Sequence, residues 1–453
     1  MNRRDFLKTG GAAALAAACT PKKKIAGQAG NDGTDGEQQM IYRENPRNGD
    51  RVSLLGFGCM RWPMITGAGP DGKDIIDQEA VNEMVDYAIA NGVNYFDTSP
   101  AYLQGLSEDA AGKALSRHPR ESYYIATKLS NFWDASAKAS IEMYHRSFEQ
   151  LRTDYFDYYL LHSIGRGGKD AFNKRYVDNG LVPFLLKEKE AGRIRNLGFS
   201  FHGAQHEFDY FMELEDSGEM HWDFCQIEMN YIDWRHADGV RNVNAEYLYA
   251  ELDKRGIPII IMEPLLGGRL ANVPEGISRQ LKEREPQKSI ASWAFRFCGS
   301  FPRVLCILSG MASMDPLLDN INTFGHFQPL TEEELEFMER MAVLMKEYPL
   351  VNCTDCKYCM PCPWGIDIPG VFQHYNRSIT EGTFAQSREQ KDYAKLKKEY
   401  LRSYDKAVAT VRQADRCIHC KECLPRCPQS ISIPRELDRI ARYVESLKQD
   451  TLP

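Results

Sequence analysis

The stretch that decides the fold reads Ser147-Phe148-Glu149-Gln150-Leu151-Arg152-Thr153-Asp154-Tyr155-Phe156-Asp157-Tyr158-Tyr159-Leu160-Leu161-His162. Its first part closes an amphipathic segment, residues 137–151, whose apolar side chains recur at the spacing of a helix. Its second part, residues 156–161, is an apolar, β-rich run that ends at the polar residue His162. The stretch therefore predicts a helix that leads directly into a buried strand.

The same alternation of strands and helices extends outward from about residue 40 to residue 330. We expect strands in residues 52–58, 93–97, 123–127, 156–161, 194–199, 224–229, 257–262 and 304–308. Amphipathic segments such as residues 79–91 and 244–255 lie between them. Gly92 and Gly256 follow these two segments, where helices often end in a left-handed residue. Eight strand–helix units over this length predict an α/β fold, a (β/α)8 TIM barrel.

A doubly wound parallel sheet is the alternative architecture. It would carry a glycine-rich phosphate loop after its first strand. Gly56-Phe57-Gly58 is too short for such a loop. The pattern therefore favours the barrel.

Polar residues stand at the ends of three consecutive expected strands, where a barrel places its chemistry. Asp97 ends the second run and Tyr102 follows it by five residues; Lys128 ends the third run and His162 the fourth. Each alone has an ordinary structural explanation, such as a helix cap, loop packing, a solvated lysine or a hydrogen-bonded core histidine. Their succession on neighbouring strand ends instead predicts a catalytic group.

Residues 40–330 resemble the aldo/keto reductase superfamily. The resemblance rests on Phe96-Asp97-Thr98 with Tyr102, on residues 147–162 quoted above, and on Gly192-Arg193-Ile194-Arg195-Asn196-Leu197-Gly198-Phe199-Ser200. It implies an oxidoreductase that interconverts a small carbonyl and an alcohol. Tyr102 would be the general acid, and a charged Lys128 would lower its pKa. Asp97 would hold Lys128 in place, and His162 would orient the carbonyl oxygen.

The resemblance also implies positions for a nicotinamide nucleotide. By this resemblance the carboxamide would be held by Ser200 and Gln226, the pyrophosphate would lie under the loop of Pro264, Leu265 and Gly267, and the adenine would lie near the segment that ends at Asn320. NAD(P)H is thus a possible cofactor. No flavin motif is evident.

Several positions depart from the family pattern. Phe201 stands where relatives commonly have asparagine, and Gly310 and Pro316 stand where many have a lysine and an arginine for the 2′-phosphate. A dianionic phosphate without a cation would be poorly held. Arg269 could substitute, or it could be an ordinary surface arginine. The preference between NADH, NADPH or neither is therefore open.

Two cysteine motifs follow residue 350. In each, three cysteines recur at every third position and a fourth precedes a proline. Structural zinc sites pair cysteines in twos across longer loops, whereas this spacing is typical of 4Fe–4S clusters. In two-cluster ferredoxins the fourth cysteine of each motif serves the other cluster. The motifs predict two 4Fe–4S clusters, with zinc and disulfides as alternatives. The expected ligand sets are Cys353, Cys356, Cys359 and Cys427, and Cys362, Cys417, Cys420 and Cys423.

The surrounding sequence suggests a ferredoxin-type domain over residues 350–453. Residues 362–369 parallel residues 427–434, which indicates an internal repeat. We expect a helical insertion over residues 370–416 and a closing helix over residues 437–447. A helical connector, residues 331–349, would join this domain to the barrel.

The N-terminus has the features of an export signal. Arg3-Arg4-Asp5-Phe6-Leu7-Lys8 precedes a short run of small residues and resembles the twin-arginine signal, whose pathway exports folded proteins. Ala16-Ala17-Ala18-Cys19 resembles a lipoprotein cleavage site, so a lipid on Cys19 is the one membrane attachment we consider. Residues 20–39 read as a disordered tether. We expect an exported protein on the periplasmic or cell-envelope side.

Composition excludes some functions. The 453 residues are 43% hydrophobic and 26% charged, and the net charge is −7. This balance is typical of a soluble globular protein and argues against a nucleic-acid partner, which needs a basic face. Four further cysteines lie in apolar parts of the barrel and are expected to be buried packing residues: Cys59, Cys225, Cys298 and Cys306.

Three functions follow from these motifs. In the first, an exported oxidoreductase acts on a small carbonyl or alcohol, and its clusters relay electrons to or from an external redox partner. In the second, a nicotinamide-dependent reductase keeps its clusters only as structural elements. In the third, the chain is a non-catalytic electron-transfer protein. The four polar residues at the strand ends argue against the third, and Phe201, Gly310 and Pro316 argue against an NADPH-dependent form of the second.

Overall fold

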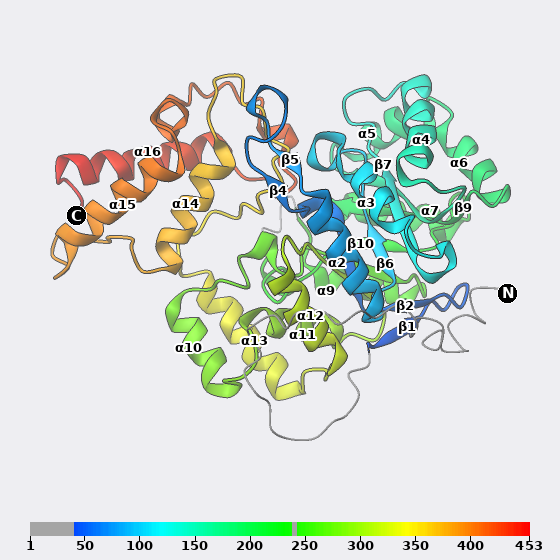
Figure 1. Ribbon diagram of the computed structural model, residues 1–453, viewed down its shortest axis with the longest axis horizontal. Helices are drawn as coiled ribbons and strands as arrows, with labels where there is room; N and C mark the ends of the chain where they lie inside the picture. The colour runs from blue at the N-terminus through cyan, green and yellow to red at the C-terminus, as the bar shows by residue number, and fades with distance from the viewer. Residues whose placement is uncertain (1–39, 238–241) are drawn as a thin grey trace.

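The computed structural model describes residues 40–237 and 242–453. Its centre is a closed barrel of eight parallel strands, in which each strand pairs with its neighbours in the sequence (Figure 1). The barrel strands are β3 (Leu55–Gly58), β6 (Tyr95–Asp97), β7 (Tyr124–Leu129), β8 (Phe156–Gly165), β9 (Ile194–His202), β10 (Cys225–Glu228), β11 (Ile259–Met262) and β12 (Val304–Ser309). The predicted TIM barrel is confirmed. The predicted export signal, Cys19 and the tether lie outside the described residues.

Helices alternate with the barrel strands and cover the outside of the barrel (Figure 1). These helices are α2 (Gln78–Ala90), α3 (Ser107–Leu115), α4 (Ala137–Leu151), α5 (Gly168–Phe172), α6 (Leu181–Glu190), α7 (Gln205–Ser217), α8 (Asp233–His236), α9 (Ala245–Lys254), α10 (Glu275–Arg284), α11 (Ile290–Gly299) and α12 (Met314–Gly325). Gly92 and Gly256 have positive φ angles of 88° and 64°, as expected after a helix. A hairpin of β4 (Met64–Ile65) and β5 (Ile75–Ile76) extends the loop after β3.

The first predicted strand, residues 52–58, is wrong as one element. It divides at Leu54 into β2 (Arg51–Ser53) and β3. Strand β2 pairs antiparallel with β1 (Tyr42–Glu44), whereas β3 pairs with β12 and β6 in the barrel. The division has a local cause, because the Ser53 hydroxyl donates to the Leu55 carbonyl and turns the chain between the two strands.

The barrel interior is filled by side chains that alternate along the strands. This interior cluster consists of Val52, Tyr95, Tyr124, Ala126, Tyr158, Leu160, Phe224, Ile260, Leu305, Cys306 and Leu308. Successive side chains of a strand point to opposite faces, so a residue two positions beyond an inward one also points inward. Asp97, Lys128 and His162 each lie two residues beyond a member of this cluster. The fold thus places all three above the apolar interior, at the carboxyl end of the barrel.

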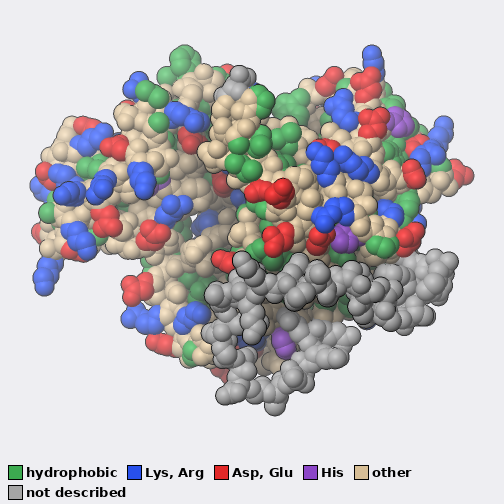
Figure 2. All heavy atoms as spheres, viewed as in Figure 1, with side chains coloured by type: hydrophobic (Ala, Val, Ile, Leu, Met, Phe, Trp, Pro, Cys, Tyr) green, Lys and Arg blue, Asp and Glu red, His purple; other side chains and the backbone are tan. Residues whose placement is uncertain are grey.

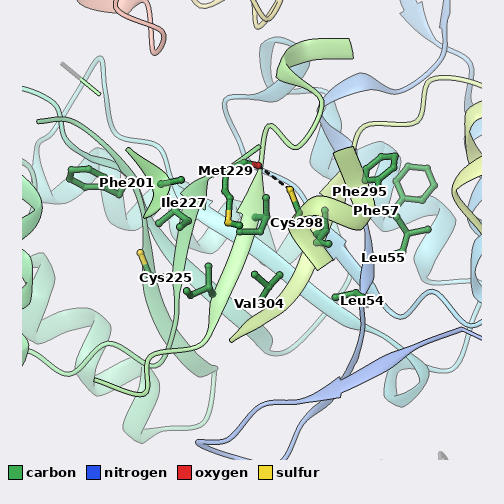
Figure 3. Packing of buried hydrophobic residues seen from close by; sticks show 14 of the residues in the cluster. Leu54, Leu55, Phe57, Phe201, Cys225, Ile227, Met229, Phe295, Cys298 and Val304 are labelled. Carbon is green, nitrogen blue, oxygen red and sulfur yellow. Dashed lines mark hydrogen bonds between the residues drawn. The ribbon is translucent and has the colours of Figure 1, made fainter. Parts of the chain in front are cut away.

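A second apolar layer lies between the strands and the surrounding helices (Figure 3). Cys59, Cys225 and Cys298 are fully buried in this layer, and Cys306 is buried in the interior cluster. The Cys298 thiol donates to the Met229 carbonyl at 3.3 Å. All four are thus packing residues, as predicted.

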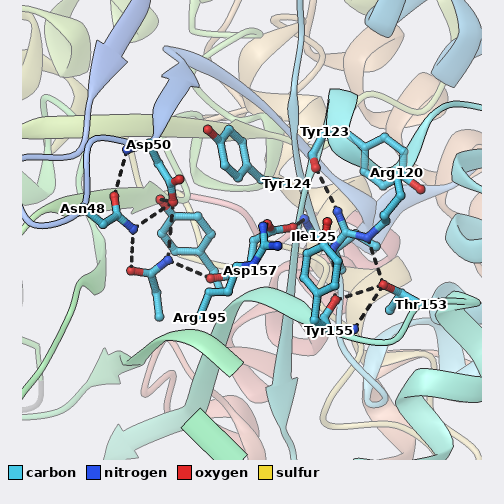
Figure 4. A network of polar contacts seen from close by, with 12 residues as sticks. Asn48, Asp50, Arg120, Tyr123, Tyr124, Ile125, Thr153, Tyr155, Asp157 and Arg195 are labelled. Carbon is cyan, nitrogen blue, oxygen red and sulfur yellow. Dashed lines mark hydrogen bonds and ion pairs between the residues drawn. The ribbon is translucent and has the colours of Figure 1, made fainter. Parts of the chain in front are cut away.

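A polar network closes the amino-terminal end of the barrel (Figure 4). The buried carboxylate of Asp157 accepts from Arg120 at 2.7 Å, from Arg195 at 3.1 Å and from the Ile125 backbone N–H at 2.9 Å. Asp157, Ile125 and Arg195 are second residues of β8, β7 and β9. The network therefore holds three neighbouring strands together at the end opposite His162.

The predicted connector contains α13 (Glu332–Met345). Its buried face is part of the barrel's outer apolar layer, to which it contributes Phe337, Met338, Met341, Ala342 and Met345. Thr331 caps this helix by accepting from the Glu334 N–H, and Glu334 accepts in return from the Thr331 N–H. The helix therefore belongs structurally to the barrel.

The C-terminal part forms its own core at one side of the barrel, on the left in Figure 1. Its helices are α14 (Ile368–Thr380), α15 (Tyr393–Ala407) and α16 (Ile433–Gln449). The predicted helical insertion supplies α15 and most of α14, and both pack with α16 around Phe372, Tyr400 and Ile440. The insertion thus builds the core of this part. On the described residues of the face in Figure 2, acidic and basic side chains are interspersed, without one broad basic surface.

Candidate active site

The predicted catalytic residues meet at the carboxyl end of the barrel. Asp97, Tyr102, Lys128 and His162 are all buried and line one pocket. The Lys128 ammonium lies 4.8 Å from the centre of the Tyr102 ring. The Tyr102 and His162 rings are nearly perpendicular, with centres 5.9 Å apart. The barrel thereby brings together residues that lie up to 65 positions apart in the chain, from Asp97 to His162.

An ion pair lies below Tyr102. Lys128 Nζ donates to Asp97 Oδ1 at 2.6 Å and to the Thr98 carbonyl at 2.8 Å. Burial lowers the pKa of Lys128 and raises that of Asp97, and the attraction between the two opposes both shifts. The second carboxylate oxygen of Asp97 has no hydrogen-bond partner among the described residues. Asp97 thus holds Lys128 against the tyrosine ring, as the sequence predicted.

The expected lowering of the tyrosine pKa does not occur. Burial raises the pKa of Tyr102 well above its usual value, and the negative charge of Asp97 is the next largest cause. The carboxylate of Asp97 lies so close behind Lys128 that the ion pair presents little net positive charge to the phenol. Tyr102 therefore keeps its proton at neutral pH, which is the form that a proton donor needs.

Two serines that the sequence analysis missed hold His162. His162 Nδ1 lies 2.5 Å from Ser130 Oγ and 3.3 Å from Ser99 Oγ. Burial and the charges of Lys128 and Arg175 keep the pKa of His162 well below its usual value, so the ring is neutral. When Nδ1 accepts the Ser130 proton, Nε2 carries the ring proton and can donate it. Ser99 and Ser130 each follow a site residue by two positions, a spacing that the strand period could have revealed.

The pocket above these residues has a volume of about 530 Å³ and is lined by both parts of the chain. From the barrel side, Phe132 and Trp133 contribute aromatic rings. Residues from the C-terminal part also line it: Cys356, Tyr358, Pro425, Arg426, Pro428 and Gln429. The cysteine motifs therefore stand next to the predicted catalytic group, which sequence spacing alone could not indicate.

Direct contacts join the two parts around this pocket. Gln429 donates to Glu228 at the end of β10, at 2.9 Å, and the Tyr358 ring lies 6.3 Å from the Phe132 ring. Arg61, just beyond β3, donates to the Thr354 carbonyl and pairs with Asp355 at 3.6 Å. The first cysteine motif thus rests on the carboxyl end of the barrel.

The eight predicted ligand cysteines are all free thiols. The charges of Cys353, Cys356 and Cys359 each interact with that of Cys427. Those of Cys362, Cys417 and Cys420 interact with that of Cys423. Cys359 also interacts with Cys423, so the eight cysteines gather in one region without each being assigned to one ligand set. Among the described residues, no three His, Cys, Asp or Glu side chains are arranged to hold a metal ion as they stand.

The two motifs also share an uncommon backbone conformation. Asp355 and Lys357 have positive φ angles, and so do His419 and Lys421, at the same offsets from Cys353 and Cys417. In both motifs the N–H two residues after the first cysteine points to its sulfur, from Asp355 to Cys353 at 3.5 Å and from His419 to Cys417. Donors around the sulfurs suit an iron–sulfur cluster, whose charge they stabilise. The residues present therefore fit the predicted clusters.

Comparison with known proteins identifies the barrel. Residues 55–342 match the sequence profile of the aldo/keto reductase family. This chain belongs to the aldo/keto reductase family. L-galactose dehydrogenase of Arabidopsis thaliana is 27% identical over 325 residues, which are 68% of this chain and 94% of that protein. An uncharacterized oxidoreductase of Bacillus subtilis is 23% identical over 318 residues, 64% of this chain and 92% of that protein.

Solved structures share the fold of this aldo/keto reductase. The holo form of an aldo-keto reductase from Bacillus halodurans superposes with a TM-score of 0.53 at 23% identity, over 67% of this chain and 96% of that one. An aldo-keto reductase from Klebsiella pneumoniae, solved in complex with NADPH, has a TM-score of 0.51 at 21% identity, over 68% and 96% of the two chains.

Two further profiles match outside the barrel of this aldo/keto reductase. Residues 352–432 match a 4Fe-4S dicluster domain, and residues 1–18 match the signal sequence of the twin-arginine translocation pathway. The chain is therefore an oxidoreductase with an iron–sulfur domain and a signal for export across the cytoplasmic membrane. No helix within the described residues has the length and apolar character needed to span a membrane.

The two residues that the resemblance assigns to the nicotinamide carboxamide lie at the pocket of this aldo/keto reductase. Ser200 and Gln226 both line the pocket and are buried. Ser200 accepts from the Ser163 N–H at 2.8 Å. The buried Oε1 of Gln226 has no hydrogen-bond partner among the described residues, so it is free to accept from a bound group. These two residues fit an amide.

The pyrophosphate end fits poorly. Pro264, Leu265 and Gly267 line the pocket, but the face of Gly267 is covered by the backbone of Thr354. Arg61 packs against Gly310, where a Cβ atom would lie 3.1 Å from Arg61 Cδ. The first cysteine motif thus contacts the loop that the resemblance assigns to the pyrophosphate, and Arg61 contacts Gly310 on the side assigned to the 2′-phosphate. Both contacts narrow the path that a whole dinucleotide would take.

Two other predicted nucleotide positions have different roles. Asn320 is buried, donates to Ser309 Oγ at 2.9 Å and does not line the pocket. Arg269 is neither a pocket cation nor a solvated surface residue. Its guanidinium donates to Asn352 at 3.0 Å, and burial lowers its pKa. It therefore joins the barrel to the C-terminal part.

Proposed function

We propose that this exported iron–sulfur aldo/keto reductase interconverts a small carbonyl compound and its alcohol, with electrons entering or leaving through two 4Fe–4S clusters and an external redox partner. One observation carries the proposal. Cys356 and Tyr358 of the first cysteine motif line the same pocket as Tyr102, Lys128 and His162. A cluster bound by that motif would stand at the wall of the substrate pocket.

The residues of the pocket account for the proton that the oxygen needs. A carbonyl that gains two electrons and two protons becomes an alcohol. Tyr102, protonated and buried, gives one proton to the carbonyl oxygen. His162 Nε2 donates a hydrogen bond to the same oxygen and orients it. The second proton, which goes to the carbon, comes from water that reaches the pocket past the exposed Trp133 and Pro425. When bound, the two clusters supply one electron each.

The covered pyrophosphate position supports this electron source over a nicotinamide nucleotide. Thr354 lies against Gly267 and Arg61 against Gly310, two positions that the resemblance assigns to the nucleotide. Gly310 and Pro316 provide no cation for a 2′-phosphate. The nicotinamide-dependent alternative, with purely structural clusters, would require the first cysteine motif to move off the barrel.

The test is turnover of anaerobic holoprotein with reduced methyl viologen as the one-electron donor and a panel of aldehydes and ketones as substrates. We expect alcohol formation that Tyr102→Phe lowers by about 100- to 10,000-fold, the usual contribution of a general acid. Cys356→Ser should abolish viologen turnover, whereas Cys59→Ser, which alters a buried packing thiol, should retain the clusters and most activity.

Other outcomes identify the alternatives. Turnover with NADH or NADPH that survives Cys356→Ser would show a nicotinamide-dependent reductase. Viologen oxidation that Tyr102→Phe leaves unchanged would show an electron-transfer protein without this catalytic group. Either result would contradict the proposed function.

A further inference from the structure

Two arginines in the pocket make no direct hydrogen bond or ion pair with the described residues. Arg166 follows β8 directly, and Arg426 lies between Cys423 and Cys427 in the C-terminal part; both line the pocket. Within residues 40–237 and 242–453, neither side chain makes a hydrogen bond or an ion pair, and both are only partly exposed. The other two pocket arginines, Arg61 and Arg175, are fully engaged by the protein.

The charge balance of the pocket is positive. Arg166, Arg426, Arg175 and Lys128 line it, together with Arg61, which is paired with Asp355. The opposing groups in the lining are the carboxylates of Asp97 and Glu263, and Cys356, which would be negatively charged as a cluster ligand. Glu263 is itself satisfied, since it accepts from the Gly267 N–H at 2.6 Å. A buried cation without a partner is unfavourable, and a bound anion relieves that cost through charge-assisted hydrogen bonds. A small anion in the pocket would therefore be attracted by Arg166 and Arg426.

We infer that the substrate of this pocket carries a carboxylate, held by Arg166 and Arg426, in addition to the carbonyl that faces Tyr102 and His162. The substrate class is thus an oxo acid or the matching hydroxy acid. Phe132, Trp133 and Tyr358 line the same pocket and provide apolar surface for the carbon skeleton. This inference rests on the proposed function and adds the charge of the substrate. It also gives the iron–sulfur part a role in substrate binding, through Arg426.

A competing role for the same arginines is to balance the charge of a cluster. The charge of Arg166 interacts with those of Cys427 and Cys356, and with the carboxylate of Glu207 beyond ion-pair distance. If that were its sole role, removing the arginine would change the reduction potential of the nearby cluster and would affect charged and uncharged substrates alike. An anion site instead discriminates between them.

The experiment measures binding of phenylglyoxylate and its methyl ester, which share a carbonyl and differ in charge. Tryptophan fluorescence of the oxidised holoprotein reports binding, because Trp133 lines the pocket. We expect the acid to bind at least about 10-fold more tightly than the ester, as one lost charge-assisted contact implies. Arg166→Gln and Arg426→Gln should each lower the affinity for the acid by about 10- to 100-fold and leave the affinity for the ester nearly unchanged. Arg402→Gln removes an equal charge from the exposed surface of α15 and should change neither.

Equal affinity for the acid and the ester, or equal losses of both in the two variants, would overturn the inference. Arg166→Lys and Arg426→Lys keep the charge and guard against misfolding, and each should retain part of the preference for the acid. Because binding is measured without turnover, it can be repeated in Tyr102→Phe. If Tyr102→Phe binds the acid more tightly than the ester, the anion site is supported even if the proposed reaction fails. If the protein shows no preference for the acid, the anion site is ruled out but the proposed reaction is not.

Discussion

Thr354 of the first cysteine motif lies directly against Gly267 of the loop after β11. A Cβ atom on Gly267 would come within 2.5 Å of the Thr354 carbonyl oxygen, and Gly267 has a positive φ of 67°. Only glycine allows this approach of two backbones. The contact holds the iron–sulfur part at the carboxyl end of the barrel, against the loop that the resemblance assigns to a nucleotide.

The first prediction concerns nicotinamide nucleotides. Because Thr354 and Arg61 narrow the path of the nucleotide, neither NADH nor NADPH should bind the holoprotein saturably up to about millimolar concentration, where binding energy is only about 4 kcal/mol. Titration of nucleotide fluorescence under anaerobic conditions measures this. Saturable binding in the micromolar range would show that the cysteine motif yields to the nucleotide.

Gly267→Ala should separate the two parts locally. The added Cβ overlaps the Thr354 backbone and also forces alanine into a left-handed conformation. Gly256→Ala is the matched control, since Gly256 has a similar φ of 64° and nothing within 4 Å of the added Cβ. We expect Gly256→Ala to lower the free energy of unfolding by about 1–2 kcal/mol and Gly267→Ala by about 1–3 kcal/mol more. If the two variants lose the same free energy of unfolding in denaturant titrations, Thr354 does not pack tightly against Gly267.

Asp157→Ala should destabilise the barrel without altering the pocket. Asp157 is fully buried between Arg120 and Arg195 at the end of the barrel opposite the catalytic group. Arg120 and Arg195 stay partly exposed, with 18% and 45% of their side chains accessible, so water compensates part of the lost ion pairs. We expect a loss of about 2–3 kcal/mol from the charge-assisted hydrogen bonds. Asp154→Ala, at an exposed neighbour, should have almost no effect. Urea unfolding of the two variants tests the ranking, and residual turnover of folded Asp157→Ala should remain normal.

Glu108 should make stability depend on pH. Its side chain is buried, and this burial raises the pKa of Glu108 to about 7. The hydroxyls of Thr127 and Ser147 donate hydrogen bonds to its carboxylate, which opposes part of the rise. Since the folded pKa lies above the unfolded value of about 4.3, this group favours folding most below about pH 4 and loses that contribution as pH rises through about 7. The loss amounts to about 4 kcal/mol.

Glu108→Gln copies the neutral form and should flatten this dependence. Thermal unfolding between about pH 5 and about pH 8 should show the melting temperature of the variant rising relative to that of the wild type as pH increases. A constant difference across that range would mean that Glu108 stays charged when buried.

Much of the fold and of the catalytic group could be predicted from the sequence, because local patterns carry that information. The period-two alternation places Asp97, Lys128 and His162 on one interior face, and their positions at strand ends bring them together in any parallel barrel. Ser130 was missed although it obeys the same alternation, because a serine carries no distinctive chemical signal.

The relation between the two parts of the chain could not be predicted. Nothing in the spacing of Cys356 or Gln429 shows that both reach the barrel pocket, since that depends on long-range packing between residues more than 200 positions apart in the case of Gln429 and Glu228. The tyrosine pKa was predicted in the wrong direction for a similar reason. Its value depends on burial and on the net charge of the Asp97–Lys128 pair, which a sequence does not provide.

The central claim is that the clusters and the pocket form one electron path. The most direct test is to reduce the holoprotein with a limiting amount of dithionite, mix it rapidly with phenylglyoxylate without oxygen, and follow cluster reoxidation by visible absorbance. We predict one mandelate for every two electrons that the dithionite supplied, which is one per protein molecule with both clusters reduced, and about 100-fold slower reoxidation in Tyr102→Phe. Clusters that stay reduced in the presence of every carbonyl tested, or that reoxidise equally fast in Tyr102→Phe, would contradict the account.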